Sequence, residues 1–500
     1  MIKFKLLALA ALSISICVAC NDLVKSKILG IVSVPSADPP AGYYNDSQLV
    51  TLTTTPNDAT IYFTLDGSIP SRNSNKYTNP IFVDLGHTLK AYAVKPGWND
   101  SGMVIASYEQ KGTVDKPKAI PGSGTFLSGQ TLTLSTTTSN AIIYYTIDGS
   151  DPLQNGIKYN NPISLTLKTV IKAVAIKEGM NNSVVTTEDY IIKHIYIGGY
   201  VNDGADGYLN AARNIACYWK DREIIELTNI ERPGSVIAIT ISNGDVYTAG
   251  GAHYWINDEQ HDLNAPGFVS GIAVNDNHVY VSGSTGWQAC YWNDGQRIEL
   301  PSTGRLSDAS AIKIVNDDIY IVGYDSLDIE DNSYYQACYW VNEKKVTLAF
   351  TGPSSSATSI DVNNNDVYIA GRYYNGNDVI ACYWKNGVKT DLSVPGTSTS
   401  KSTANANAIT IEGGHIYIAG TYYYQLNEIP CYWLDGQLIN LPYNLAVRIN
   451  DIAVLNGIPY IVGYQNSVGA CYWIDNNSYN ALFNARGTYS EAYGIIIADE

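Results

Sequence analysis

The stretch Asp366–Leu392, DVYIAGRYYNGNDVIACYWKNGVKTDL, returns in varied form seven times between Ile195 and Glu500. Each copy contains a Tyr-x-x-Gly run, whose tyrosines are Tyr196, Tyr247, Tyr280, Tyr320, Tyr368, Tyr417 and Tyr460. Each copy also contains a Tyr-Trp pair, which ends at Trp219, Trp255, Trp292, Trp340, Trp384, Trp433 or Trp473. Short β-branched and aromatic runs that recur about every 44 residues are typical of a β-propeller.

The spacing of the repeated residues predicts which connections are tight. In six copies an opening Ile precedes the Tyr by eight positions, as in Ile360–Tyr368. In six copies a closing Leu follows the Trp by eight positions, as in Trp384–Leu392. Pairs such as Asn386-Gly387 fall inside these intervals and supply the positive φ angles of tight turns. We therefore expect rigid hairpins between strands 1 and 2 and between strands 3 and 4 of each blade.

The other two connections of each blade vary in length. The separation from Tyr to Trp ranges from 8 positions in Tyr247–Trp255 to 23 in Tyr196–Trp219. In a four-stranded antiparallel blade, the 2–3 and 4–1 connections emerge on one side, here called the loop face; the tight hairpins form the hairpin face. Because function on a rigid scaffold resides mostly in variable loops, we expect the loop face to bind a ligand.

The two ends of the repeat region predict how the ring closes. The first copy begins at Ile195-Tyr196 without a strand 1, whereas Ala492–Ala498 reads as a strand 1 with no partners after it. We expect this last strand to complete the first blade, which gives a seven-bladed β-propeller over residues 194–500 with no free edge. The predicted fold class is all-β, with two tandem β-sandwiches before the propeller.

The net charge argues against one class of partner, and the first residues indicate export. Asp and Glu number 47 against 31 Lys and Arg, a net charge of −16, which argues against nucleic acid as a partner. Residues 1–19 predict a signal peptide, because Lys3 and Lys5 precede an apolar run, Leu6–Val18, that is too short to span a bilayer.

The end of that segment, Cys17-Val18-Ala19-Cys20, resembles a bacterial lipobox. The resemblance implies that Cys20 becomes a lipidated amino terminus, with residues 20–30 as a tether to the membrane. It also implies a location in the cell envelope, at the outer membrane or the cell surface. An ordinary signal peptide that is cleaved nearby is the alternative.

A second repeat, offset by 82 residues, lies between the tether and the propeller. Ile61–Pro70, IYFTLDGSIP, matches Ile143–Pro152, IYYTIDGSDP, and Lys76-Tyr77 matches Lys158-Tyr159. Short alternating strands with frequent turn signals predict a small β-sandwich for each of residues 31–110 and 111–193. The motifs resemble the chitobiase/β-hexosaminidase carboxy-terminal domain, a fibronectin type III-like module. That resemblance implies a spacer role, since catalysis in the enzymes that name the family resides in other domains.

Candidate reactive side chains are mostly explained by packing. Six cysteines occupy one blade position before the Tyr-Trp pair, namely Cys217, Cys290, Cys338, Cys382, Cys431 and Cys471. Equivalent positions on neighbouring blades lie too far apart for disulfides, so we expect buried free thiols. Asp66 and Asp148 are expected to shape Asp-Gly turns. We predict neither a metal site nor a cofactor, because the histidines form no ligand set and nucleotide-binding motifs are absent from the sequence.

The loop face carries residues that recognition surfaces favour, because Tyr, Trp and Arg combine large contact area with a polar tip. The predicted ligand-binding residues are Tyr208, Arg213, Trp287, Arg305, Tyr334, Tyr335, Arg372, Tyr373, Tyr374, Tyr422, Tyr423, Tyr424, Arg448 and Arg486. Local packing of abundant tyrosines is the alternative for any single residue.

Three functions remain open on the sequence alone. The first is a lipoprotein whose loop face binds a glycan or protein ligand without catalysis, so no catalytic residue is assigned. The second is a carbohydrate-active enzyme, a glycoside hydrolase or lyase, that uses arginines and a carboxylate pair at the channel mouth. The third is a structural component of a cell-surface assembly.

Overall fold

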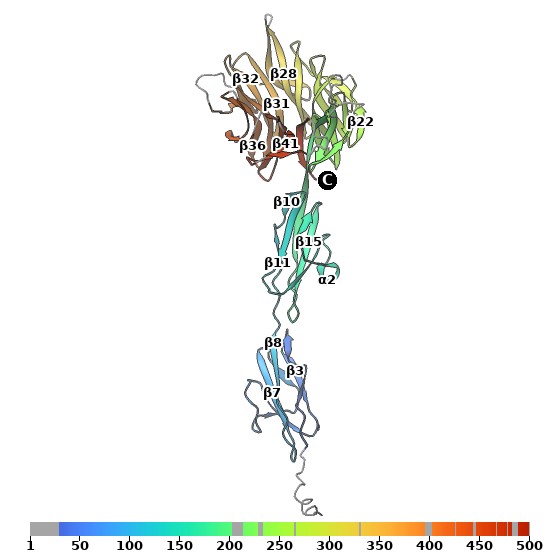
Figure 1. The fold of residues 1–500 in the computed structure, drawn as a ribbon, viewed down its shortest axis with the longest axis vertical. Coiled ribbons are helices and arrows are strands. Elements are labelled where there is room, and N and C mark those ends of the chain that lie inside the picture. Colours follow the sequence, from blue (N-terminus) through green and yellow to red (C-terminus); the bar gives the residue numbers. More distant parts are fainter. Residues whose placement is uncertain are drawn as a thin grey trace, which may run out of the picture. The chain divides into compact units, whose positions relative to one another are not determined.

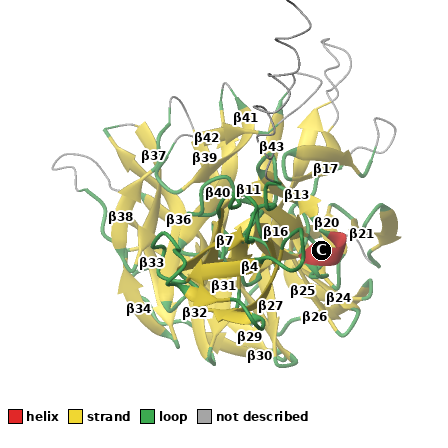
Figure 2. Cartoon of the chain, turned by 90° about the horizontal axis from the view of Figure 1, so that it is seen from below, coloured by secondary structure: helices red, strands yellow, loops and turns green. Residues whose placement is uncertain are grey.

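The computed structural model describes residues 30–202, 214–228, 234–264, 267–329, 332–395, 403–425, 427–443, 447–466, 468–477, 479–482 and 489–499. Strands dominate these ranges, in which α2 (Pro152–Asn155) is the one helix, so the all-β prediction is confirmed (Figures 1 and 2). None of the described helical segments is long and apolar enough to cross a membrane. The predicted signal peptide and Cys20 lie outside the described residues. The chain divides into two compact units; Ser123–Leu132, Ile163–Thr169 and the residues from Asp189 onward form the second.

The first sandwich consists of two sheets around an apolar core. One sheet has the order β1 (Ser36–Asp38), β3 (Gln48–Thr53), β6 (Ile81–Val83), and the other has the order β2 (Gly42–Tyr44), β8 (Val104–Gln110), β7 (His87–Val94), β4 (Thr60–Thr64), β5 (Asn75–Lys76). Strand β7 shows how the core forms, because every second residue points to the interior: Leu89, Ala91 and Ala93 are fully buried. Val50 and Tyr108 meet them from the two sheets.

The second sandwich repeats this strand order. Its smaller sheet is β14 (Ile163–Leu165), β11 (Gln130–Ser135), β9 (Lys118–Ile120), and its larger sheet contains β13 (Ile157–Lys158), β12 (Ile142–Thr146), β15 (Thr169–Ile176), β16 (Thr186–Asn202) and β10 (Gly124–Leu127). Strand β10 pairs with β16 in parallel, as β2 pairs with β8 in the first copy. Asp66 and Asp148 accept hydrogen bonds from the amides of Ser68 and Ser150 at 3.0 Å, so both shape turns as predicted.

The repeated sequence forms four-stranded antiparallel sheets, each with its strands in chain order. Six of these sheets are β19 (Ala238–Ser242), β20 (Asp245–Gly250), β21 (His253–Ile256), β22 (Glu259–Asp262); β23 (Phe268–Asn275), β24 (His278–Thr285), β25 (Gln288–Asn293), β26 (Gln296–Glu299); β27 (Ser307–Val315), β28 (Asp318–Ile329), β29 (Asn332–Val341), β30 (Lys344–Thr347); β31 (Ser354–Asn363), β32 (Asp366–Tyr374), β33 (Val379–Lys385), β34 (Val388–Asp391); β35 (Ala404–Glu412), β36 (His415–Tyr424), β37 (Asn427–Leu434), β38 (Gln437–Asn440); and β39 (Val447–Leu455), β40 (Ile458–Gln465), β41 (Gly469–Ile474), β42 (Tyr479–Ala481).

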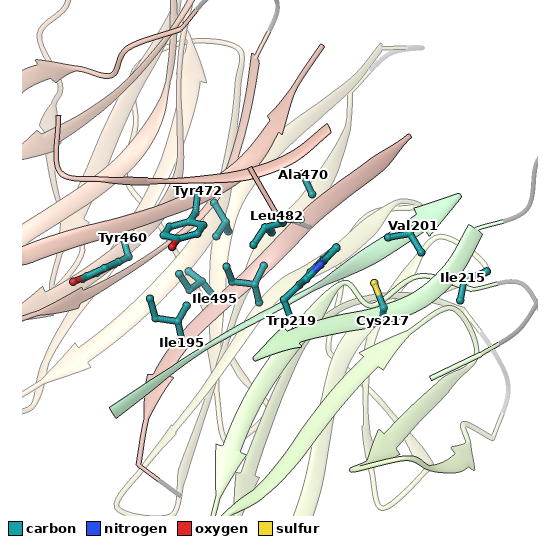
Figure 3. Packing of buried hydrophobic residues seen from close by; sticks show 13 residues of the cluster. Ile195, Val201, Ile215, Cys217, Trp219, Tyr460, Ala470, Tyr472, Leu482 and Ile495 are labelled. Atoms are coloured by element: carbon teal, nitrogen blue, oxygen red, sulfur yellow. The ribbon is translucent and has the colours of Figure 1, made fainter. Parts of the chain in front are cut away.

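The first and last strands of this region belong to the same sheet. Strand β16 pairs with β17 (Asn214–Lys220), which pairs with β18 (Glu223–Glu226), while β43 (Ser490–Ala498) pairs antiparallel with the other edge of β16. Ile195 and Trp219 of this sheet pack against Tyr460 and Tyr472 of the last complete sheet, with Ile495 of β43 between them (Figure 3). Burial of these large side chains ties the two ends of the repeat region together.

The Gly of each Tyr-x-x-Gly run marks a close approach of two strands. A Cβ atom on Gly250 would lie 1.7 Å from the Ser235 carbonyl oxygen, and one on Gly323 would lie 1.8 Å from that of Asp308. The other five repeats show the same conflict with strand 1, because a β-bulge lies opposite this Gly in most sheets. The repeated Gly is therefore required by sheet geometry.

In five sheets the repeated Trp ties the sheet to the one before it, whereas Trp255 Nε1 is buried without a hydrogen-bond partner in the described structure. Trp340 Nε1 donates to the Pro301 carbonyl at 2.9 Å, and Trp384 Nε1 donates to the Ala349 carbonyl at 2.7 Å. Each accepting carbonyl directly follows the closing Leu of the preceding sheet, and Trp292, Trp433 and Trp473 repeat the contact. These indoles are fully buried, so the bond satisfies a donor that would otherwise be costly to bury.

The hairpin face is uniform, as the spacing predicts. Asn386 and Gly387 have φ angles of 50° and 80°, as the mirror-image turns of tight hairpins require. Asn386 Oδ1 also accepts from the Val367 amide at 2.8 Å. In three other sheets an Asp takes this place and pairs with a His; for example, His278 Nδ1 lies 2.5 Å from Asp294 Oδ2. The histidines on this face therefore stabilise turns.

Candidate binding cleft

A polar cleft opens between two neighbouring sheets, β27–β30 and β31–β34. Its volume is about 430 Å³, within the range of small-molecule sites. Its lining residues come from both sheets: Ser310, Tyr324, Tyr335, Ser354, Ser355, Ser356, Ala357, Thr358, Arg372, Tyr373, Tyr374 and Val379. The cleft thus brings together four of the predicted ligand-binding residues.

Extended strands, not irregular loops, position these side chains. The register of β28 and β29 continues to the pair Ile329 and Asn332, so Tyr334 and Tyr335 lie on a long hairpin. On β32, Arg372 is exposed, Tyr373 is 5% exposed, and Tyr374 is half-buried. This alternation follows from the two-residue period of a strand. The sequence motif Arg-Tyr-Tyr therefore presents its members to different surroundings.

Arg372 is the cation of the cleft. Its Nη1 donates to Asn405 Oδ1, on β35 of the next sheet, at 2.6 Å. Within the described ranges, no carboxylate oxygen is recorded within 4.0 Å of this guanidinium. Although the Arg372 side chain as a whole is exposed, desolvation by the surrounding protein lowers the pKa of its guanidinium, which stays charged at neutral pH. The cleft therefore contains a positive charge without an internal counter-ion among the described residues.

Aromatic and hydroxyl groups form the other walls. Tyr324 and Tyr335 meet edge to face, with ring centroids 4.8 Å apart and an interplanar angle of 70°. Ser354 Oγ accepts from the Tyr335 amide at 3.2 Å, and Ser355 Oγ accepts from the Ala337 amide at 2.9 Å. The two serines thereby join the sheets at the cleft, and the rings gain a fixed orientation.

A buried charge pair supports the hairpin from behind. The Asp325 carboxylate is 1% exposed and forms an ion pair with Lys345. It also accepts from the Ser302 hydroxyl and from the Thr303 amide and hydroxyl, each at 2.7 Å. Burial alone would raise the pKa of Asp325, but Lys345 and these donors together lower it to about 2. The network fixes the connection before β27 to the β28 strand.

The remaining predicted residues lie elsewhere. Trp287 is 67% exposed at the β24–β25 turn, beside the exposed Phe268, with ring centroids 6.2 Å apart. Arg305 is exposed near that turn, and its backbone carbonyl accepts a hydrogen bond from Gln288. Tyr334, on β29, is half-buried. The structure does not bring these residues into the cleft. Tyr208, Arg213 and Arg486 lie outside the described residues.

The Tyr422–Tyr424 run is divided between core and surface. Tyr422 is 2% exposed and its hydroxyl donates to Asn440 at 3.2 Å, so its predicted place on the binding surface is corrected to the core. Tyr423 is 40% exposed and Tyr424 is half-buried. Tyr373 lines the cleft but is mostly buried, so its predicted place on the binding surface is also partly corrected. Its hydroxyl donates to Asp391, and the Lys389 ammonium lies 3.7 Å from its ring.

Arg448 belongs to a second cluster, around Glu491. The Arg448 guanidinium lies 3.5 Å from the Glu491 carboxylate, which is 2% exposed and accepts from Tyr493 at 3.2 Å. Tyr200 and Tyr489 each place a hydroxyl 3.5 Å from the same carboxylate. Burial, reinforced by the charge of Glu491, raises the pKa of Tyr489 and Tyr493.

A central channel of about 510 Å³ runs along the first strands of the sheets. Ile239, Ile272, Ile312 and their counterparts through Ile495 line it. Side chains at the bulges join neighbouring first strands: Thr358 Oγ1 donates to the Ala406 carbonyl at 2.7 Å, and Asn407 Nδ2 donates to the Ile449 carbonyl at 2.6 Å. The polar groups of the channel are thus largely engaged in holding sheets together.

Sequence reasoning missed the serine wall and Tyr324. Ser354, Ser355 and Ser356 follow a long 4–1 connection, and that run of small hydroxyl residues was the available signal.

The thiols were predicted correctly: all six described cysteines are free and buried. Burial raises the pKa of Cys338 to about 12, which makes it unreactive. Within the described ranges, no group of three or more His, Cys, Asp or Glu residues could hold a metal ion.

Comparison with known proteins identifies the sandwiches. Residues 39–105 and 121–187 match the family model of the chitobiase/beta-hexosaminidase C-terminal domain, so the predicted resemblance is confirmed for both copies. A search of curated proteins gave no match. A quinonprotein alcohol dehydrogenase-like protein from Bacteroides thetaiotaomicron is 14% identical over 76% of this chain and 98% of its own, with a TM-score of 0.33. The β-propeller domain of the trilobed protease from Pyrococcus furiosus is 11% identical over 59% of this chain and 93% of its own, with a TM-score of 0.39.

Proposed function

We propose that the protein is an exported lipoprotein that binds a glycan, without catalysis, in the cleft between the sheets β27–β30 and β31–β34. The cleft itself carries the proposal. Tyr324, Tyr335 and Tyr374 offer aromatic surface, while Ser356 and Arg372 offer a hydroxyl group and a cation. Sugars present apolar ring faces surrounded by hydroxyl groups, so such a lining can pack and hydrogen-bond at once.

A glycan array with the soluble fragment of residues 21–500, which lacks Cys20 and is called the mature chain below, tests this function. We expect binding to at least one glycan, and a loss of ten-fold or more in affinity for the double variant Tyr335→Ala/Tyr374→Ala. The matched control is Tyr43→Ala, since Tyr43 is a 61% exposed tyrosine of the first sandwich. The absence of binding to every glycan on the array would contradict the proposal and favour a protein ligand or a structural role in a surface assembly.

Anchoring rests on Cys20 and on the lipobox-like run before it. Lipidation there would place the protein at the outer membrane or the cell surface, because several acyl chains hold a protein firmly in a bilayer. A Cys20→Ala variant is expected to move from the membrane fraction to the soluble fraction. If both forms remain in the membrane fraction, the anchor is not at Cys20.

Closure of a seven-bladed ring by β43 is part of the proposal. Asn450 Nδ2 donates to the Ala492 carbonyl of β43 at 2.7 Å, which repeats the contact of Asn407 with Ile449 one sheet earlier. The Ile495 amide also donates to Asp451 at 2.9 Å. Deletion of residues 490–500 is therefore expected to abolish cooperative unfolding of the ring, measured by near-UV circular dichroism during thermal denaturation. A two-state transition of unchanged midpoint would contradict closure.

A glycoside hydrolase or lyase is the second candidate, favoured by the cluster of Glu491, Arg448 and Tyr493. Phenol, cation and carboxylate groups together can support acid–base chemistry on a sugar. Most glycosidases use two carboxylates, however, and the described cluster contains one that is 2% exposed. Shortened products released from a bound glycan, and lost in a Glu491→Gln variant, would favour this enzyme over a binding protein.

A further inference from the structure

We propose that the ligand of the cleft is a carboxylate-bearing glycan, whose acid group pairs with Arg372. This inference rests on the proposed glycan binding and specifies the class of sugar. It starts from the unusual position of Arg372: the guanidinium lies in a cleft, and the partner recorded for it is the neutral side-chain oxygen of Asn405.

The surrounding electrostatics make a positive charge here exceptional. The chain has a net charge of −16, and acidic partners are near for other basic groups of these two sheets. Lys345 pairs with Asp325, Lys385 with Asp366, and Lys389 with Asp391. Arg372 lacks such a partner among the described residues although desolvation lowers its pKa. A bound anion would supply the missing counter-charge.

The geometry of arginine favours a carboxylate. A guanidinium has five N–H donors in a planar fork, and Asn405 accepts from Nη1, so donors remain for a bidentate contact. Ser356 of β31 also lines the cleft, and its hydroxyl group suits a ring hydroxyl of a sugar acid. Tyr335, held by Ser354, adds an aromatic wall for the sugar ring.

Other acidic residues of these two sheets form no ion pair with Arg372 in the described structure. Asp308 accepts from the Ser310 hydroxyl at 3.3 Å, and Asp325 is bound by Lys345 on the other side of the hairpin. Asp378 lies at the β32–β33 turn, where its amide donates to Asn375. Each carboxylate weakens the attraction of the cleft for anions, so the pairing of a ligand depends on direct contact with Arg372.

The test compares matched ligands that differ in charge. Oligogalacturonate is titrated into the mature chain by calorimetry beside its methyl ester, and sialyllactose is titrated beside lactose. Alginate and hyaluronan oligosaccharides extend the acidic set, and a sulfated oligosaccharide serves as a different anion. We expect at least one carboxylate glycan to bind ten-fold or more tightly than its neutral counterpart. Binding should weaken as salt is added, since Arg372 is partly exposed.

Two variants locate that preference. Arg372→Met should lose the ten-fold preference for the acidic glycan, whereas Arg222→Met on the hairpin face should leave both the preference and the affinity unchanged. Asn405→Asp should also abolish the preference, because a carboxylate on the Nη1 side of Arg372 supplies the counter-charge within the protein. This second variant keeps Arg372 in place and adds an ion pair, so it remains informative if Arg372→Met fails to fold.

The outcomes separate this inference from the proposed function. Equal affinity for acid and ester, or a preference that survives in Asn405→Asp, overturns the role of Arg372 but leaves glycan binding intact. Preference for the sulfated glycan alone overturns the assignment to carboxylates. Binding to none of the glycans overturns the proposed function itself.

Discussion

The two sides of the β28–β29 hairpin treat charge in opposite ways. Behind it, Asp325 is buried together with Lys345 and three further donor groups, so its charge is compensated within the protein. In front of it, Arg372 of the next sheet faces a cleft with the neutral Asn405 as its recorded partner. A charge that is paired within the protein contributes to the stability of the fold, whereas a charge without an internal counter-ion can pair with a ligand. The comparison separates structural from recognition residues that look alike in sequence.

Removal of the compensated charge should have the largest effect. Asp325→Ala leaves the Lys345 ammonium and the Thr303 amide without their acceptor, so we expect the free energy of unfolding of the repeat region to fall by about 3–5 kcal/mol. Chemical denaturation followed by tryptophan fluorescence measures this. The control is Asp366→Ala, which breaks an ion pair with Lys385 that is largely exposed and should cost about 1 kcal/mol or less. Equal losses in both variants would contradict the distinction.

The same carboxylate should make the stability of the repeat region sensitive to acid. The folded pKa of Asp325, about 2, lies below its ordinary value of 3.8, so its contribution is present above pH 4 and is lost as the pH falls toward 2. The difference corresponds to about 2 kcal/mol. In Asp325→Ala, this part of the acid sensitivity should be missing when unfolding is measured between pH 2 and pH 5.

A second carboxylate, that of Asp451, should give stability the opposite dependence on pH. Burial raises the pKa of Asp451 to about 6, although the Ile495 and Ile452 amides and Lys313 partly offset it. The folded state then binds the proton more tightly than the unfolded state, so stability falls as the pH rises from about 4 to 6. Because Asp451 lines the open channel, the change is at most about 3 kcal/mol.

Asp451→Asn measures this effect. The variant loses the titratable group but keeps one acceptor oxygen for the strand amides, so its stability should vary less between pH 4 and pH 6 than that of the unmodified protein. Comparison of the two proteins by urea denaturation at each pH isolates the contribution of Asp451. Parallel curves for the two proteins would mean that Asp451 stays ionised in the channel.

The sequence predicted the repeated structure far better than the cleft. Tyr-x-x-Gly and Tyr-Trp recur because most sheets have the same bulge and the same indole contact, so a pattern repeated along the chain reports local geometry. The cleft depends on how two sheets meet, which differs for each pair. Residue type predicted Arg372 and Tyr335, which line the cleft, but not that Tyr422 points into the core or that Tyr324 joins Tyr335. Strand register decides those orientations, and sequence spacing leaves it open by one residue.

Trp287 offers the smallest and sharpest comparison of stability with recognition. It has a φ of 66° in the turn after β24, although this backbone region favours Gly and Asn, and its side chain is 67% exposed. Trp287→Asn should therefore raise the free energy of unfolding by about 1 kcal/mol if the exposed ring contributes little to folding. Thermal denaturation measures the change, and Tyr43→Ala again serves as the exposed aromatic control. A stabilised variant that binds the loop-face ligand more weakly would show that the strained Trp serves recognition. A destabilised variant would mean that its contact with Phe268 supports the turn, which would then be a structural feature like the hairpin face.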